Sequence, residues 1–237
     1  MATVILVRHG LTAMTGPVLA GWTPGVHLDG RGRDQAAALA RRLSRVPLAS
    51  VVTSPLERCR ETAEAIVAER EGTTVTADER VGECRYGDWT GQRLNKLAKE
   101  KLWQVVQAHP SAATFPGERG ESLRDTQHRA VSAIRDWNVR ASGGTYLVCT
   151  HGDVIKAIVA DALGLHLDLF QRIQVDPCSL TVIRYTDLRP FLVRLNDTGG
   201  GVDDLVPPGE TPRRRWTLRR SKKRESDAVV GGGSGSA

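Results

Sequence analysis

Cysteine is scarce in this chain, and its spacing argues against two kinds of site. The four cysteines are Cys59, Cys84, Cys149 and Cys178, and no two of them form a Cys-x-x-Cys pair. Zinc sites and disulfide frameworks usually depend on closely spaced cysteines. We therefore predict reduced thiols that pack as small buried side chains, as is typical of a reducing compartment.

Long apolar runs are also absent. No stretch approaches the ~20 apolar residues of a membrane-spanning helix. The first residues, Met1-Ala2-Thr3, lead into a strand-like segment without the basic start and cleavage site of a signal peptide. With 40% hydrophobic residues among 237, the chain can bury one substantial core. These features predict a cytoplasmic protein with one domain over residues 1–197.

Outside one short segment the chain has no excess of charge. Residues 211–227 carry eight Lys or Arg and two Asp or Glu, which accounts for the whole formal net charge of +6. The rest of the chain is formally neutral, so the net charge does not indicate an acidic partner. Residues 198–237 are rich in Gly, Pro, Ser and like charges, and we predict a disordered basic tail there. Solvated disorder is preferred for this tail over contact with nucleic acid or a membrane.

The remaining sequence alternates between short β-branched or apolar runs and longer amphipathic stretches. This alternation is typical of an α/β fold, and we predict a three-layer α/β/α sandwich with a mainly parallel central sheet. No feature of the pattern predicts an oligomeric state. Strands are expected at 3–7, 49–53, 145–149, 180–186 and 190–195, and helices at 31–45, 55–71, 93–108, 121–140 and 154–163.

Two of the expected strands end in the same dipeptide. The run from Val4 continues through Arg8 to His9-Gly10, and the run from Thr145 ends in His151-Gly152. Ligands of open parallel sheets bind beyond the carboxyl ends of the strands. The two histidines are therefore expected to face one crevice if their strands are neighbours.

A third candidate segment lies where the strand ending at residue 53 meets a helix. Ser54 is expected to be the N-cap, Pro55 the first helical residue and Glu57 the partner in a capping box. Arg58 then falls in the first turn, beside free backbone N–H groups and the positive end of the helix dipole. This position suits an anion.

Two arginines and two histidines make a receptor for a phosphoryl group. Guanidinium groups match phosphate oxygens, and a neutral imidazole can attack phosphorus directly. The leaving group then needs an acid, and the loop at residues 81–91 offers Glu83 and Asp88. A partly dry loop of this kind raises a carboxyl pKa. Spacing alone does not choose between the two.

These stretches together resemble the histidine phosphatase superfamily, also called the phosphoglycerate mutase-like family. The resemblance covers about residues 3–195. It is carried by five motifs in family order: "RHG" at 8–10, "SPLERCRETA" at 54–63, "GECRYGDWTG" at 82–91, "GES" at 120–122 and "THG" at 150–152.

The resemblance implies a hydrolase for a small phosphorylated metabolite that needs no metal and no cofactor. It implies that His9 is the phosphorylated nucleophile. It also favours Glu83 over Asp88 as the proton donor, because the acid of the family precedes a Tyr/Phe-Gly pair. The phosphate pocket implied by the resemblance consists of Arg8, Arg58 and His151.

The loop after the first motif departs from the family pattern. Leu11 stands where the family usually has Glu or Gln, and Thr15 stands where it has Asn. Thr15 is expected to give a phosphate oxygen one hydroxyl hydrogen bond, with less reach than an amide. A second interpretation is therefore a weakly active or non-catalytic phosphate-binding regulatory protein.

A phosphoglycerate mutase is the other alternative. The cofactor-dependent mutases of the family carry a longer insertion between the acid and the second histidine, whereas Glu83 and His151 lie only 68 positions apart. The shorter insertion favours an open, water-accessible site and hence a phosphatase. Residues 84–125 are expected to form much of a cap over the site. Its candidates for polar recognition are Arg85, Arg93, Arg119 and Glu121.

Overall fold

Six strands form one sheet in the computed structural model, which describes residues 1–141, 143–199, 228–229 and 233–234. The strand order is β3-β2-β4-β1-β5-β6. The first four of these are parallel, whereas β5 and β6 are antiparallel to their neighbours. The strands are β1 (Ala2–Arg8), β2 (Ser50–Thr53), β3 (Val75–Ala77), β4 (Thr145–Thr150), β5 (Leu180–Tyr185) and β6 (Pro190–Asp197).

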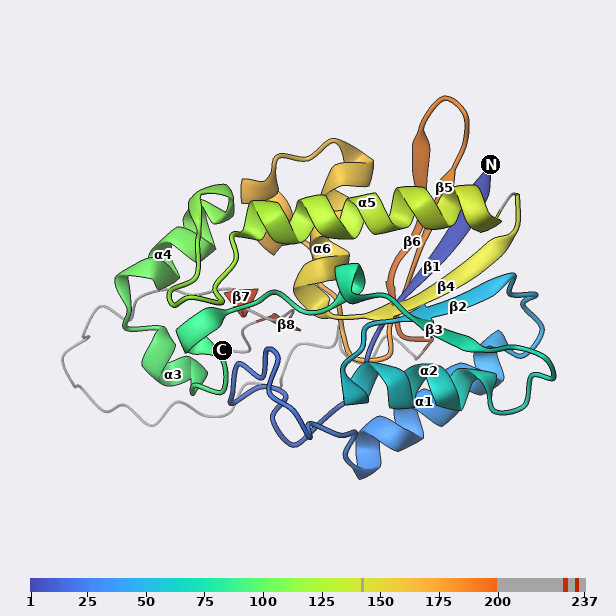
Figure 1. Ribbon diagram of the computed structural model, residues 1–237, viewed down its shortest axis with the longest axis horizontal. Helices are drawn as coiled ribbons and strands as arrows, with labels where there is room; N and C mark the ends of the chain where they lie inside the picture. The colour runs from blue at the N-terminus through green and yellow to red at the C-terminus, as the bar shows by residue number, and fades with distance from the viewer. Residues whose placement is uncertain (142, 200–227, 230–232, 235–237) are drawn as a thin grey trace, which may run out of the picture.

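Helices cover both faces of this sheet, as Figure 1 shows. One face carries α1 (Gly30–Leu43) and α2 (Glu57–Val67), and the other carries α5 (Leu123–Ala141) and α6 (Gly152–Leu163). The predicted three-layer α/β/α sandwich with a mainly parallel sheet is confirmed. Two shorter helices, α3 (Leu94–Leu97) and α4 (Lys101–Ala108), lie in the segment between β3 and α5.

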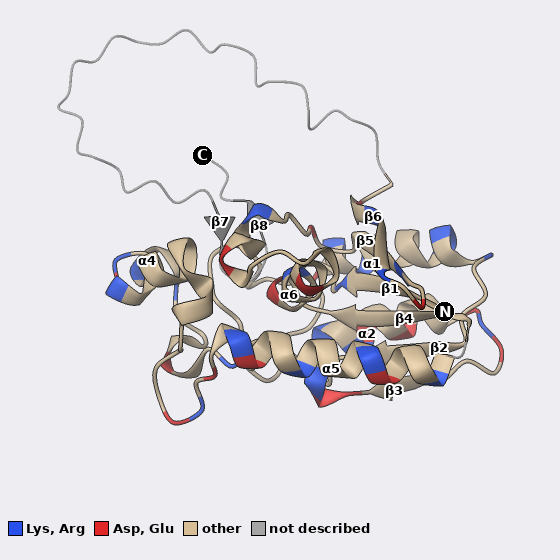
Figure 2. Cartoon of the chain, turned by 90° about the horizontal axis from the view of Figure 1, so that it is seen from above, with Lys and Arg blue, Asp and Glu red and all other residues tan. Residues whose placement is uncertain are grey.

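The central strands are apolar on both sides because both sides are covered. In β1, Val4 and Leu6 pack into the core under α5 and α6, while Ile5 and Val7 pack into the core under α1 and α2. Each such buried side chain contributes about 1.5–3 kcal/mol. Figure 2 shows the charged residues on the outer helices, with basic and acidic residues, here Arg and Asp, interspersed along α5.

Two elements differ from the sequence prediction. β3 was not predicted, because its three residues are exposed or half-buried at the edge of the sheet and have little apolar pattern. The single helix expected at 93–108 is divided into α3 and α4 by the extended backbone of Glu100. This break lets both Leu97 and Trp103 reach the core, so tertiary burial overrides the local helical pattern.

Most of the predicted tail, 198–237, lies outside the described residues. Within it, the backbone of Ala228–Val229 (β7) pairs antiparallel with that of Gly233–Ser234 (β8). Among the helices in the described ranges, none is long and apolar enough to cross a bilayer.

Candidate active site

The pairing of β1 with β4 brings the two His-Gly segments together. Arg8 is opposite Thr150 in the parallel register, and the ladder continues one step further when His9 N–H donates to the Thr150 carbonyl at 3.0 Å. The His9 and His151 rings meet edge to face with centroids 5.2 Å apart. The two histidines therefore lie against each other at the ends of neighbouring strands.

The hydrogen bonds of His9 determine its tautomer. Its Nδ1 lies 2.8 Å from the carbonyl oxygen of Gly10. Because a carbonyl only accepts, Nδ1 carries the proton, and Nε2 holds the lone pair. Burial, together with the charges of Arg58 and Arg8, lowers the pKa of His9 well below its usual value. The ring is therefore neutral, with Nε2 as its nucleophilic atom.

Arg58 reaches both histidines from the first turn of α2. Its Nε donates to His9 Nε2 at 3.2 Å, and its Nη2 lies 3.3 Å from His151 Nδ1 and donates to the Gly21 carbonyl at 2.8 Å. The side chain is buried, yet its Nη1 has no hydrogen-bond partner among the described residues. A buried guanidinium with an unused donor is suited to an incoming anion.

Arg8 supplies a second buried cation beside His9. Its Nη1 donates to the Val175 carbonyl at 2.7 Å, which fixes the guanidinium at the end of β1. Burial lowers the pKa of Arg8 from its usual value, and the nearby carboxylates of Glu83 and Asp153 oppose this effect. An arginine keeps its charge through such a change, so both arginines remain cations around His9.

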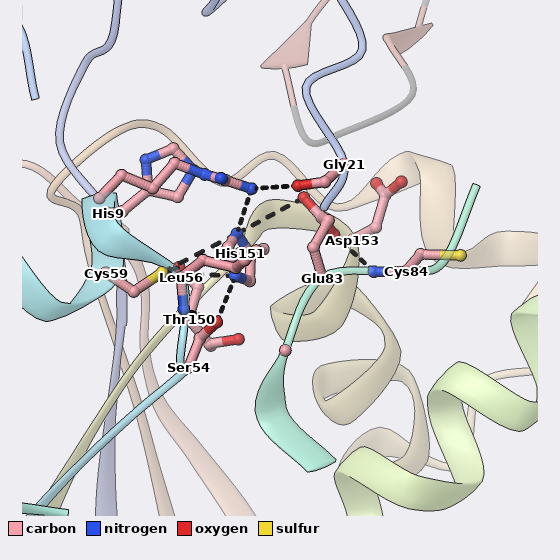
Figure 3. A network of polar contacts seen from close by, with 12 residues as sticks. His9, Gly21, Ser54, Leu56, Cys59, Glu83, Cys84, Thr150, His151 and Asp153 are labelled. Carbon is pink, nitrogen blue, oxygen red and sulfur yellow. Dashed lines mark hydrogen bonds and ion pairs between the residues drawn. The ribbon is translucent and has the colours of Figure 1, made fainter. Parts of the chain in front are cut away.

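Ser54 does not cap α2, contrary to the sequence prediction. The helix begins at Glu57, and its N-cap is Leu56, whose own side chain makes no capping hydrogen bond. The Ser54 hydroxyl accepts from the N–H of Leu56, at 3.4 Å, and not from a backbone N–H of the helix. Ser54 is instead fully buried, with its hydroxyl 2.8 Å from His151 Nε2. A polar contact that orients a buried histidine has taken the place of the local cap (Figure 3).

Glu83 lies next to His151 in a loop that is held in place by hydrogen bonds. Its Oε2 is 3.6 Å from His151 Nδ1, and its Oε1 accepts from the Cys84 N–H at 3.0 Å. Arg129 on α5 donates to the Glu83 main-chain carbonyl at 2.9 Å. Glu83 as a whole residue is 4% exposed. Burial and, second, the charge of Asp153 raise the pKa of Glu83 to about 7.

Asp88, the rival acid, lies elsewhere. It is exposed, and it lines a cavity of about 490 Å³ on the cap that also includes Arg85 and Arg119. Glu121, expected to be available for recognition, is instead paired with Arg129 at 2.6 Å and accepts from the Arg85 N–H. The cavity is lined by Trp22, Arg85, Gly87, Asp88, Thr90, Glu118 and Arg119.

The loop after the first motif is held by its own hydrogen bonds. The Thr15 hydroxyl accepts from the Thr12 N–H at 3.0 Å and lies 3.0 Å from the Thr12 hydroxyl. The carbonyl of Leu11 packs so closely on Gly32 that a Cβ at Gly32 would lie 2.0 Å from it. Thr15 therefore stabilises the loop, and its contact with phosphate stays a prediction.

Two buried charged residues of the site were missed in the sequence. Asp153 and Lys156 lie on α6, and both are 1% exposed. They are three positions apart in the helix "GDVIKAIVADAL", whose remaining charged residue, Asp161, is exposed. Two charges among the apolar residues of a buried helical stretch are a signal that sequence reasoning can use, because buried charges are rare unless they are paired.

The thiols are buried, as predicted, and burial raises the pKa of Cys84 and of Cys149 well above the usual value. Among the residues that the structure describes, no group of three or more His, Cys, Asp or Glu side chains could hold a metal ion.

Comparisons with known proteins agree with this geometry. Over 213 residues the chain is 29% identical to a probable phosphoglycerate mutase GpmB of Klebsiella pneumoniae, covering 88% of this chain and 97% of the relative. It is 29% identical over 209 residues to phosphoserine phosphatase 1 of Hydrogenobacter thermophilus, covering 84% and 93%. The structure of Bacillus stearothermophilus YhfR superposes with a TM-score of 0.76 at 29% identity, covering 83% and 98%. The sequence profile of the histidine phosphatase superfamily (branch 1) matches residues 4–198, and the chain belongs to this superfamily.

Proposed function

We propose that this protein hydrolyses a small phosphomonoester through a phosphohistidine on His9, without a metal ion. The observation that carries the proposal is the state of His9. The Gly10 carbonyl holds the proton of His9 on Nδ1, so the lone pair is on Nε2, where it accepts a hydrogen bond from Arg58 Nε. Glu83 lies in the same buried cluster. Phosphoryl transfer to nitrogen requires a neutral nucleophile, a cationic pocket for the phosphate and a protonated acid for the leaving group.

In the first step, the Nε2 lone pair of His9 forms a bond to phosphorus while the bond from phosphorus to the ester oxygen breaks. Glu83, whose pKa is raised to about 7, gives its proton to that oxygen, so an alcohol leaves. Arg8 and Arg58 stabilise the negative charge on the equatorial oxygens.

In the second step, Glu83 is ionised and accepts a proton from water. The water oxygen bonds to phosphorus, the bond from nitrogen to phosphorus breaks, and its electron pair returns to Nε2. Inorganic phosphate leaves, and Glu83 has regained its proton. His151, whose pKa burial and Arg58 lower well below the usual value, stays neutral and can donate a hydrogen bond to a phosphate oxygen.

Hydrolysis is favoured over phosphoglycerate mutase activity by the short segment between Glu83 and His151. The relatives carry both kinds of name, phosphoglycerate mutase and phosphoserine phosphatase. A mutase must keep the phosphoenzyme away from water, and a segment of 68 positions leaves little chain to cover it. Stimulation of phosphoglycerate interconversion by 2,3-bisphosphoglycerate would favour the mutase instead.

The test uses p-nitrophenyl phosphate and a panel of phosphorylated metabolites. The wild-type protein is expected to release nitrophenol and to trap an acid-labile, base-stable phosphoryl group after a rapid quench. His9→Ala is expected to lose both signals, whereas His27→Ala, which replaces an exposed histidine outside the cluster, keeps them. The absence of turnover across the panel would favour the non-catalytic phosphate-binding alternative.

A further inference from the structure

Asp153 is a buried carboxylate that the proposed reaction does not use. It is the second residue of α6 and 1% exposed. Figure 3 shows its side chain beside that of Glu83, with His151 on the other side of Glu83. Two carboxyl groups placed close together in a dry site do not ionise together without cost.

Contacts with Tyr86 and Lys156 hold the Asp153 side chain in position. The hydroxyl of Tyr86 donates to its Oδ2 at 2.9 Å, and Lys156 Nζ lies 3.8 Å from its Oδ1. Tyr86 is itself fully buried and packs edge to face on Phe115 at 4.9 Å. Lys156 donates to Gln171 at 3.0 Å. These contacts give the buried Asp153 carboxylate hydrogen-bond and ion-pair partners that offset the cost of its burial.

Glu83 is surrounded by groups of both signs. The arginines and Lys156 favour its ionised form, and Asp153 opposes it. Asp153 therefore offsets part of the positive field that the phosphate pocket imposes on the acid. Charged or titratable groups act on Glu83 from every element packed against it. Three are arginines, namely Arg8 of β1, Arg58 of α2 and Arg129 of α5. The others are His151 at the N-cap of α6, Asp153 and Lys156 on α6, and Cys84 and Tyr86 in the loop of Glu83 itself.

A pocket that binds phosphate with two arginines creates a difficulty for its own acid. Cations lower the pKa of a neighbouring carboxyl, and an ionised Glu83 cannot protonate a leaving group. Burial raises the pKa of Glu83, and the charge of Asp153 is the second cause in the same direction. The negative charge of Asp153, beside Glu83, opposes the lowering of the Glu83 pKa by the arginines and does not contact the phosphate.

We propose that Asp153 is a positioning residue whose buried carboxylate keeps the transferable proton on Glu83. The inference rests on the proposed function, in which Glu83 is the proton donor. Tyr86 and Lys156 hold this carboxylate in place. Asp153 thus offsets the effect of the cationic pocket on the acid.

The first experiment measures the proton on Glu83 directly. Protein labelled with ¹³C at the glutamate carboxyl is titrated by NMR, and the resonance of Glu83 is identified by its loss in Glu83→Gln. The wild-type midpoint is expected at about pH 7. Asp153→Asn keeps an oxygen acceptor for Tyr86 but removes the charge, and it is expected to lower the midpoint by about one pH unit or more.

Two further variants control this measurement. Asp161→Asn makes the same chemical change at an exposed position of the same helix, and its midpoint is expected to equal that of the wild type. Asp153→Ser also removes the charge and fits the space, so it replaces Asp153→Asn if that variant does not fold. A midpoint for Glu83 that is the same with and without the Asp153 charge would overturn the inference.

The second experiment is kinetic. With a substrate that has an alkyl leaving group, the alkaline limb of kcat/KM is expected to move to lower pH in Asp153→Asn, by the same amount as the NMR midpoint. The limb stays in place if Asp153 has only a structural role. A protein that shows the NMR shift but hydrolyses no phosphomonoester would refute the proposed function and leave the action of Asp153 on Glu83 established.

Discussion

Replacing Glu83 with glutamine is expected to stabilise the fold at alkaline pH. Burial and Asp153 raise the pKa of this carboxyl from 4.5 to about 7 in the folded protein. As the pH rises from 4.5 to 7, the unfolded chain releases a proton that the folded protein keeps, so the free energy of unfolding falls. Above pH 7 both states are ionised, and this loss of stability stays constant. The loss amounts to about 3 kcal/mol above the folded pKa and is absent below the unfolded one.

Glutamine cannot ionise, so it removes this loss of stability. Its amide oxygen can still accept the Cys84 N–H that now donates to Glu83 Oε1 at 3.0 Å. The amide hydrogens need partners of their own, which reduces the gain. We therefore expect a gain of about 1–3 kcal/mol at about pH 8 and none at about pH 4.

The same substitution is expected to lower activity in a way that depends on the leaving group. Loss of a general acid reduces kcat/KM by about 10²–10⁴-fold for an alkyl phosphate. Nitrophenol is a good leaving group that needs little help from an acid, so the first step survives, while hydrolysis of the phosphohistidine is slow without a base. Glu83→Gln is therefore expected to show a burst of about one nitrophenol per site, followed by slow turnover.

Urea unfolding at the two pH values and stopped-flow absorbance with p-nitrophenyl phosphate measure these effects. Glu69→Gln, at an exposed position outside the cluster and the cap cavity, is the matched control and is expected to show neither. Equal stability changes at both pH values would refute the raised pKa of Glu83. Equal losses for alkyl and nitrophenyl substrates, without a burst, would refute its role as proton donor.

Three further predictions concern the surroundings of the site. Arg58→Lys loses the hydrogen bonds to His9 and Gly21 together, and it is expected to reduce kcat/KM in steady-state kinetics by about 10²-fold or more. An unchanged kcat/KM would contradict the role of Arg58 in phosphate binding. Glu121→Ala leaves Arg129 without its ion pair and is expected to lower the free energy of unfolding in urea by about 3 kcal/mol. A loss below about 1 kcal/mol would show that solvent replaces the ion pair. Asp29 accepts from the N–H of Gly32 at the start of α1, so Asp29→Ala is expected to cost about 1 kcal/mol with kcat unchanged, and a fall in kcat would link this cap to the loop that follows His9.

Much of the fold and the site was accessible from local patterns. The apolar runs ending in His9 and His151 predicted two buried strands, and the parallel register of β1 and β4 places their ends together. The central strands were predicted because both faces of a covered sheet select apolar residues, and the main helices because their apolar residues recur every three or four positions. The family motifs then indicated Arg58 and Glu83, which the structure brings into the same buried cluster.

Other features depended on contacts between distant segments. Ser54 has every local feature of a helix cap, yet its hydroxyl is used by His151, which is 97 positions away. Glu121 looked available for a ligand until Arg129 was placed beside it. A short edge strand such as β3 carries too little apolar pattern to be recognised without its neighbour β2.

The sequence alone determined which chemistry is present: a histidine after each of two buried strands, arginines beside them and a carboxyl in a dry loop. It also determined the layered fold, because hydrophobic periodicity is a local property. Only the tertiary structure decided the protonation of these groups. The tautomer of His9 depends on the Gly10 carbonyl, and the proton on Glu83 depends on the burial of its loop and on the Asp153 carboxylate. Burial and electric field are set by all the neighbours of a group in space, and no local stretch of sequence contains them.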